Sequence, residues 1–310
     1  MNIRKAADPI EIRSVFVVLY GQPGIRKTSW SFTAKKPLLL DYNQGVRRVK
    51  SQYRGDYLAM SKWEDGLEIF KNPDELGAYD TIVIDTVGSA LELLTVAIAK
   101  GKGGDKLTKK DGALTIQGFG ALAASFKVFL NQMRALNKNL VFIAHDKEVT
   151  KNDETTVRPD IQGQTLGLLL RDADLVGYMR SFNNSNTVTF APTDVSYGKN
   201  TCALPNDMDV SQTTLADVID KALENMNSDS KLYAQYVEQL KRVDIALGLV
   251  ESVDELNMAM DSIRDIEYVS DAKAQVGNLI RAKVKEVGAV LNKTTKLYEP
   301  AEKKSTVPSE

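Results

Sequence analysis

The feature that most constrains this chain is a glycine-rich loop between an apolar strand and a helix. The run Val15–Tyr20 is apolar, the loop GQPGIRKTS occupies positions 21–29, and residues 29–34 can form a helix. Strand, glycine-rich loop, Lys-Thr and helix, in this order, build the cradle that binds a phosphate chain. Glycines let backbone N–H groups curve around an anion, and the helix start adds partial positive charge. The sequence therefore predicts an α/β fold with a phosphate-binding loop after its first strand.

The loop predicts ATP and Mg²⁺ as ligands. Lys27 is expected to reach the terminal phosphates, and the Thr28 hydroxyl to bind Mg²⁺. Arg26 stands where glycine usually precedes the lysine, and arginine adopts a positive φ less cheaply than glycine. Either the loop is distorted there, or the extra cation itself contacts phosphate. The loop residues expected to contact nucleotide are Gly21, Gln22, Pro23, Gly24, Ile25, Arg26, Lys27, Thr28 and Ser29.

Two further strands are expected to end in carboxylates. Residues 36–41 form an apolar run that ends at Asp41, and residues 79–85 form another that ends at Asp85. Continuous apolar runs of this kind are typical of a parallel sheet covered on both faces. Asp85 is expected to hold the Mg²⁺ shell, and a helix should follow from Thr86 to about Lys100. A strand that ends in a solvated Asp is common by itself, but its pairing with the upstream loop is specific.

Polar segments follow these strands. Residues 100–112 contain five lysines and two aspartates, and they form either a solvated connector or a surface that contacts nucleic-acid phosphates. A helix is expected over residues 117–137, with its phenylalanines, including Phe119, in the core. A further strand, residues 139–145, ends at His145, the only histidine, which is either a packed residue or a γ-phosphate sensor. A polar hairpin or loop should occupy residues 146–167.

The character of the sequence changes after the helix expected at residues 215–226. Residues 227–230 form a predicted linker, and helices are expected at 231–249, 253–266 and 268–292. Two capping boxes mark helix starts, Thr214 with Asp217 and Ser252 with Glu255. The predicted domains are an ATP-binding core (1–227), a small helical domain (228–298) and a disordered tail (299–310).

Composition excludes several classes of protein. Lys and Arg number 40 against 41 Asp and Glu, so any nucleic-acid contact must come from local patches. The single cysteine, Cys202, excludes an intrachain disulfide, which fits a reducing cytoplasm. No apolar segment resembles a signal peptide or reaches the length of a membrane span.

Residues 13–226 together resemble the RecA-like ATPases, specifically the phage ATP-binding recombinases of the Sak single-strand annealing group. The resemblance rests on the loop at 21–28 and on the segments LLLDYNQG (38–45), IVIDTVGSAL (82–91), LVFIAH (140–145), RPDIQG (158–163) and ADLVGY (173–178). It implies a RecA-like P-loop NTPase core with a mainly parallel sheet flanked by helices. It also implies a protein that binds ATP and single-stranded DNA, forms filaments or rings, and pairs complementary strands.

The resemblance assigns further roles to residues of this chain. The family's polar sensor maps onto His145, and its segment that reaches a neighbouring subunit's ATP maps onto Lys199 and Asn200. Its water-activating glutamate maps onto Asn43, which can orient water but cannot accept its proton. Its two DNA-contacting loops map onto residues 100–116 and 147–164. The cations expected to contact DNA there are Lys102, Lys106, Lys109, Lys110, Lys147, Lys151 and Arg158.

These assignments predict a weak, DNA-dependent ATPase that binds and anneals single-stranded DNA in the cytoplasm of a bacterial host. The catalytic set is Lys27, Asn43, Asp85 and His145, and hydrolysis should be slow because of Asn43 and Arg26. Two alternatives remain open. One is a nucleotide-gated scaffold whose helical domain recruits a partner such as a single-strand DNA-binding protein, and the other is a generic P-loop ATPase or helicase loader without DNA contacts of its own.

Overall fold

One large sheet organises the α/β part of this computed structural model, which describes residues 11–182 and 185–301. Its strands are β1 (Phe16–Gly21), β2 (Pro37–Asp41), β3 (Asp56–Ala59), β4 (Thr81–Asp85), β5 (Asn139–Lys151), β6 (Glu154–Pro159), β7 (Leu175–Phe182), β8 (Ser185–Thr189), β9 (Lys199–Asn200) and β10 (Asp207–Asp209). The order is β10-β8-β7-β1-β5-β4-β2-β3, with β6 paired to β5 and β9 to β7.

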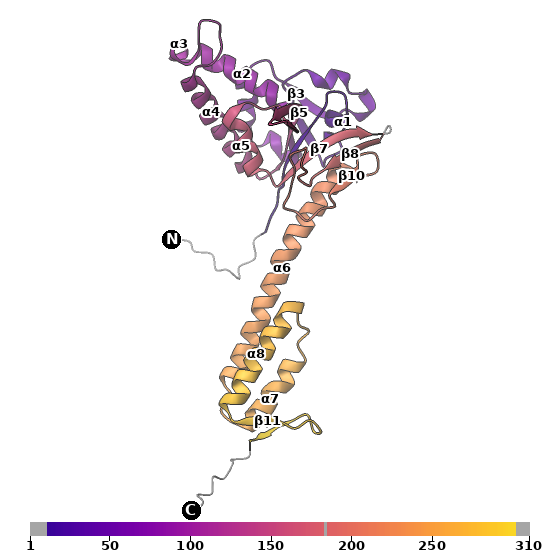
Figure 1. Cartoon of the computed structure of the whole chain (residues 1–310), viewed down its shortest axis with the longest axis vertical. Helices are drawn as coiled ribbons and strands as arrows, with labels where there is room; N and C mark the ends of the chain where they lie inside the picture. The colour runs from indigo at the N-terminus through magenta and orange to yellow at the C-terminus, as the bar shows by residue number, and fades with distance from the viewer. Residues whose placement is uncertain (1–10, 183–184, 302–310) are drawn as a thin grey trace, which may run out of the picture. The chain divides into compact units, whose positions relative to one another are not determined.

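The central strands are parallel. Each neighbouring pair along the path β7-β1-β5-β4-β2-β3 runs in the same direction, whereas β8, β9, β10 and β6 pair antiparallel. Helices flank the sheet, and Figure 1 shows α2, α4 and α5 together on one side of it. These helices are α1 (Lys27–Ser31), α2 (Val87–Lys100), α3 (Gly104–Leu107), α4 (Ile116–Ala135) and α5 (Gly163–Asp172). The prediction of a RecA-like P-loop NTPase core is confirmed.

Alternating side chains of each strand build a separate core on each face of the sheet. In β1, Phe16, Val18 and Tyr20 enter one cluster, and Val17 and Leu19 enter the other. The first cluster is completed by α2, α4 and α5, and the second by Trp30 of α1 and the first turns of α6 (Leu215–Gly248). Burial of both faces explains why the strands read as continuous apolar runs.

Short 3-10 turns connect the strands on the β2–β4 side. They are η1 (Gly45–Arg48), η2 (Ser51–Tyr53), η3 (Trp63–Phe70) and η4 (Glu75–Ala78). The strand register places the carboxyl ends of the central strands side by side. Gly21 lies opposite His145, and Asp85 lies opposite both Asp41 and Ile143.

The helical part contains α6 (Leu215–Gly248), α7 (Val253–Arg264), α8 (Ser270–Glu286) and a hairpin of β11 (Ala289–Leu291) and β12 (Tyr298–Pro300). The chain divides into two compact units, of which one is Ile12–Met226 and the other holds the helices that follow. Each unit has its own core. The capping boxes at Thr214 and Ser252 form as predicted.

Several predictions in this region are wrong. The predicted linker at 227–230 is part of α6, which is continuous from Leu215 to Gly248. The helix expected to reach 292 ends at Glu286, and residues expected in a disordered tail from 299 onward include strand β12. Residues 302–310 lie outside the described residues. Phe119 was expected in the core but is 46% exposed on the first turn of α4.

In the described ranges, no helix is long and apolar enough to cross a membrane.

Candidate functional site: a phosphate-binding loop at the sheet edge

The phosphate-binding loop leaves the carboxyl end of β1 and enters α1. Position 21 must be glycine because the backbone passes close to β7 there: an added Cβ would lie 2.2 Å from the Met179 carbonyl oxygen. Gly24 has φ +86°, and a Cβ built there would meet no atom within 4 Å. Arg26 has φ 68° and ψ 26°, which is the left-handed conformation that glycine adopts most readily and that costs other residues about 1–2 kcal/mol. The arginine thus takes the backbone geometry of the glycine it replaces.

Lys27 is held inside this loop. The residue is 5% exposed, and its Nζ donates hydrogen bonds to the carbonyl oxygens of Gly21, at 2.7 Å, and Gln22, at 2.8 Å. Burial lowers the pKa of Lys27 to about 8, although Asp85 and Asp146 act in the opposite direction. A buried ammonium that is hydrogen-bonded only to neutral carbonyl oxygens gains stronger, charge-assisted hydrogen bonds when phosphate oxygens replace them.

The predicted Mg²⁺ ligands meet across the sheet edge. Thr28 Oγ1 donates a hydrogen bond of 2.6 Å to Asp85 Oδ2. Burial raises the pKa of Asp85 to about 6, and the hydrogen bond from Thr28 lowers it in part. Within the described ranges, no cluster of three or more His, Cys, Asp or Glu side chains could cage a metal. One hydroxyl and one carboxylate next to a phosphate loop are the set that suits Mg²⁺, which takes its other ligands from phosphates and water.

The end of β2 carries the predicted water-activating position. Asn43 Oδ1 is buried, and the described residues offer it no hydrogen-bond partner. Asp41 is not a free base, because its carboxylate accepts hydrogen bonds from the backbone N–H groups of Gly45, at 2.8 Å, and Val46, at 3.1 Å. Asp41 therefore anchors η1, and the nearby Asn43 has no carboxylate that could act as a base in its place.

His145 lies beside the loop. It pairs in register with Gly21, it is half-buried, and its Nδ1 has no partner within the described chain. Burial lowers the pKa of His145, and the charge of Lys27 lowers it further. A neutral imidazole at neutral pH, close to Lys27, is consistent with the predicted sensing position.

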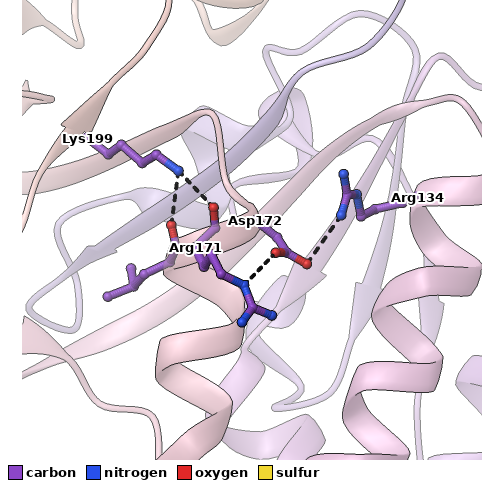
Figure 2. Close-up of polar contacts among 5 residues, drawn as sticks. Arg134, Arg171, Asp172 and Lys199 are labelled. Atoms are coloured by element: carbon purple, nitrogen blue, oxygen red, sulfur yellow. Dashed lines mark hydrogen bonds and ion pairs between the residues drawn. The ribbon is translucent and has the colours of Figure 1, made fainter.

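Lys199 lies elsewhere. Its Nζ donates to the carbonyl oxygens of Leu170, at 3.3 Å, and Arg171, at 2.9 Å, at the end of α5 (Figure 2). Figure 2 also shows Asp172 paired with both Arg171 and Arg134. Since α5 leads into the start of β7, this cluster lies at the amino edge of the sheet, away from the loop. Lys199 is thus not part of the phosphate site of its own chain.

The cations predicted to contact DNA occupy two segments. Lys102, Lys106, Lys109 and Lys110 are exposed in the connection between α2 and α4, around α3. Figure 1 shows α3 at the end of the α2–α4 pair that is remote from α1.

The other segment is the β5–β6 hairpin, which continues directly from the sheet edge. Lys147 lies opposite Arg158 in the hairpin and also pairs with Asp160 at 3.7 Å. Lys151 is exposed near the tip of the hairpin.

A basic segment after β2 was not among the predicted site residues. Residues 45–55 carry Arg47, Arg48, Lys50 and Arg54 without an acidic residue, and this one-sided charge was the available signal. Arg48 and Lys50 of this segment line a cavity of about 620 Å³ together with Gly24 and Arg26 of the phosphate loop.

Affinity for ATP with Mg²⁺ is expected to be highest between about pH 6 and 8. The ligand favours charged Lys27, so its affinity should fall as pH rises through the free-state pKa of about 8. It also favours ionised Asp85, so its affinity should fall as pH drops through about 6. Because a phosphate has its own ionisation near pH ~6, the alkaline limb is the diagnostic one, with a loss approaching about tenfold per pH unit. Calorimetric titration across this range checks the profile, and a constant affinity from neutral pH into the alkaline range would contradict it.

The chain is similar to several known proteins. A curated relative, the SPbeta prophage-derived uncharacterized protein YorG of Bacillus subtilis (strain 168), is 23% identical over 291 residues, which are 91% of this chain and 81% of the relative. The flagellar accessory protein FlaH from Methanocaldococcus jannaschii is a structural match at TM-score 0.36 and 8% identity, covering 63% of this chain and 84% of that chain. The family model described as AAA domain (AAA_24) matches residues 13–202. Because this match spans more than half of the chain and contains the complete phosphate loop and Asp85, the protein belongs to the AAA_24 family of P-loop ATPase domains.

Proposed function

We propose that this P-loop ATPase binds single-stranded DNA in an ATP-dependent manner and anneals complementary strands, as the Sak group of phage recombinases does. The supporting observation is the continuity of β5. This strand carries His145 beside the phosphate loop and, two residues later, Lys147, which faces Arg158 across the hairpin. A change in nucleotide state at the loop is transmitted along this strand to the hairpin that carries Lys147, Lys151 and Arg158.

The lysine-rich segment is connected to the same site through a second strand. β4 ends at Asp85, α2 starts two residues later, and the lysines follow the end of α2. Beside these lysines, Ile116 is 92% exposed and Phe119 is 46% exposed. Cations that bind phosphates, together with an exposed aromatic side chain such as Phe119 on which a base can stack, are what sequence-tolerant binding of single strands uses.

Hydrolysis is proposed to be slow. Asparagine at position 43 cannot accept a proton from water, and Asp41 is engaged by the backbone of η1. Bound ATP then acts mainly as a switch that holds the DNA-binding conformation, and Mg²⁺ is proposed to lie between Thr28 and Asp85. Assembly into a filament or ring, in the cytoplasm of a bacterial host, completes the proposal, because a long single strand needs a series of such surfaces.

A second candidate is a nucleotide-gated scaffold that recruits a partner such as a single-strand DNA-binding protein. It is favoured by exposed apolar side chains of the helical unit, where Leu249 is 78% and Met258 75% exposed. The two functions differ in one result. The scaffold binds its partner but does not shift the mobility of bare single-stranded DNA in the presence of ATP and Mg²⁺.

The triple variant Lys106→Ala/Lys109→Ala/Lys110→Ala tests the DNA surface. Loss of three phosphate contacts should weaken binding to single-stranded DNA by roughly tenfold to thirtyfold at moderate salt and reduce the salt slope by about 2. Fluorescence anisotropy over a salt series measures both quantities.

The matched control, Lys273→Ala/Lys285→Ala/Lys293→Ala, removes the same charge from exposed positions of the helical unit and should leave binding unchanged. Equal losses in both triple variants, or an unchanged salt slope in the first, would refute the assignment of the lysine-rich segment.

A further inference from the structure

Arg48 is the last residue of η1 and is fixed by the backbone at the carboxyl end of β2. Asp41 accepts hydrogen bonds from the N–H groups of Gly45 and Val46, and so anchors the start of η1. A Cβ built on Gly45 would lie 2.5 Å from Asn43 Oδ1 and 3.4 Å from Arg48 Nη2. The guanidinium is therefore folded back over Gly45, toward the side chain of Asn43.

In the part of the chain that the structure describes, no acidic side chain forms an ion pair with Arg48. Across the described residues, its side chain makes no ion pair and no hydrogen bond, and the same is true of Arg26 and Lys50. Arg48 nevertheless lies close enough to Asp85 and His145, at the centre of the site, to affect their pKa values. Burial raises the pKa of Asp85 and lowers that of His145, and the charge of Arg48 lowers both pKa values by a smaller amount, so that it opposes burial at Asp85 and adds to it at His145.

Arg48 also lines the cavity of about 620 Å³ beside the phosphate loop. Gly24, Arg26 and Ser29 line it as well, and so does Lys50, which follows Arg48 in the same basic segment. The described lining includes these three cations and no acidic side chain. Unpaired cations around a cavity of this size attract a polyanionic ligand, because an anion then gains charge-assisted hydrogen bonds without displacing an existing partner.

We propose that Arg48 is a phosphate-binding residue that the chain supplies to its own nucleotide site, where its guanidinium contacts the terminal phosphates of a bound nucleoside triphosphate. This inference rests on the proposed binding of ATP. A guanidinium presents a planar fork of donors that matches two phosphate oxygens, and an arginine that contacts the terminal phosphate stabilises the charge that develops during its transfer. Lys27 does not line this cavity, and it would approach the same phosphates from inside the loop.

The proposal is tested by the binding of ligands that differ in their number of phosphates, and this test does not depend on ATP hydrolysis. The variants are Arg48→Gln and Arg47→Gln, because Arg47 is the adjacent exposed cation of the same turn and does not line the cavity. The probes are ATP, ADP, AMP and inorganic tripolyphosphate, each with Mg²⁺, and calorimetry gives Kd. Arg48→Gln should weaken ATP and tripolyphosphate by about tenfold or more, weaken ADP less, and leave AMP unchanged. Arg47→Gln should match the wild type, and Arg48→Lys should retain part of the affinity.

Each outcome is decisive. If the wild type binds ATP but Arg48→Gln equals Arg47→Gln, the role of Arg48 is wrong and ATP binding stands. An equal loss of affinity for AMP and ATP in Arg48→Gln would assign the residue to the nucleoside or to folding, which the thermal unfolding of the ligand-free variant reports independently. If the wild type binds neither ATP nor tripolyphosphate, the inference and the proposed ATP binding are both wrong. If ATP binding depends on Arg48 but no DNA is bound, only the DNA part of the proposed function fails.

Discussion

Replacing Lys27 with alanine is expected to weaken ATP binding by several hundred-fold. The ammonium is the one cation buried inside the loop, and its contacts with carbonyl oxygens are free to be exchanged for phosphate contacts. Two charge-assisted hydrogen bonds to phosphate, at about 1.5–3 kcal/mol each, account for a loss of this size. Calorimetry with ATP and Mg²⁺ measures it, with Lys35→Ala as the control, because Lys35 is exposed and nearby in sequence.

This loss should not arise from unfolding. The lowered pKa of Lys27, about 8, means that burial of its charge destabilises the ligand-free fold at neutral pH. Alanine removes that cost, so the free energy of unfolding of Lys27→Ala without nucleotide should not fall below that of the wild type. Undiminished ATP affinity in Lys27→Ala would show that the loop is not the nucleotide site.

Replacing Asn43 with glutamate is expected to raise the rate of ATP hydrolysis by about 100-fold, which is the usual contribution of a positioned general base. Asn43 Oδ1 is buried just after β2 and has no hydrogen-bond partner among the described residues, and at the end of the neighbouring strand β4, Asp85 accepts a hydrogen bond from Thr28 of α1. A carboxylate at position 43 would accept the proton that the asparagine cannot. Release of inorganic phosphate, measured with and without single-stranded DNA, gives the rate.

Asn43→Gln is the matched control for this variant, because it adds the same methylene group without the charge. Its rate should stay near that of the wild type. If Asn43→Glu is no faster than Asn43→Gln, position 43 is not where water is activated, and slow hydrolysis needs another explanation.

The sheet and the centre of the site follow from local sequence. Continuous apolar runs such as Ile82–Ile84 are explained by two buried faces, so the strands and the polar residues at their ends were predicted. The contact between Thr28 and Asp85 follows as well, since strands that run parallel bring their carboxyl ends to one edge.

Features that depend on tertiary context did not follow from the sequence. Residues 227–230 are poor helix formers, yet each costs only about 0.5 kcal/mol in a helix, and helical segments on both sides keep α6 continuous. Phe119 matches the helical spacing of the core but lies on the first turn of α4, where it stays exposed.

The positions of two basic side chains, Lys199 and Arg48, could not be predicted from the sequence either. The direction of the Lys199 side chain is set by the pairing of β9 with β7. Sequence patterns do not predict this long-range pairing. Arg48 lies on a 3-10 turn too short to give a periodic signal, and its place beside the loop comes from the long-range order of the strands.

The central claim is that a triphosphate bound between Lys27 and Asp85 controls the affinity of the protein for single-stranded DNA. Its most direct test is the Kd of the wild-type protein for a single-stranded oligonucleotide, measured by anisotropy with ATP and Mg²⁺ and again without nucleotide. The account predicts binding that is roughly tenfold or more tighter with ATP and Mg²⁺, within the usual range of coupling between two sites. Identical affinity in the two conditions would contradict it.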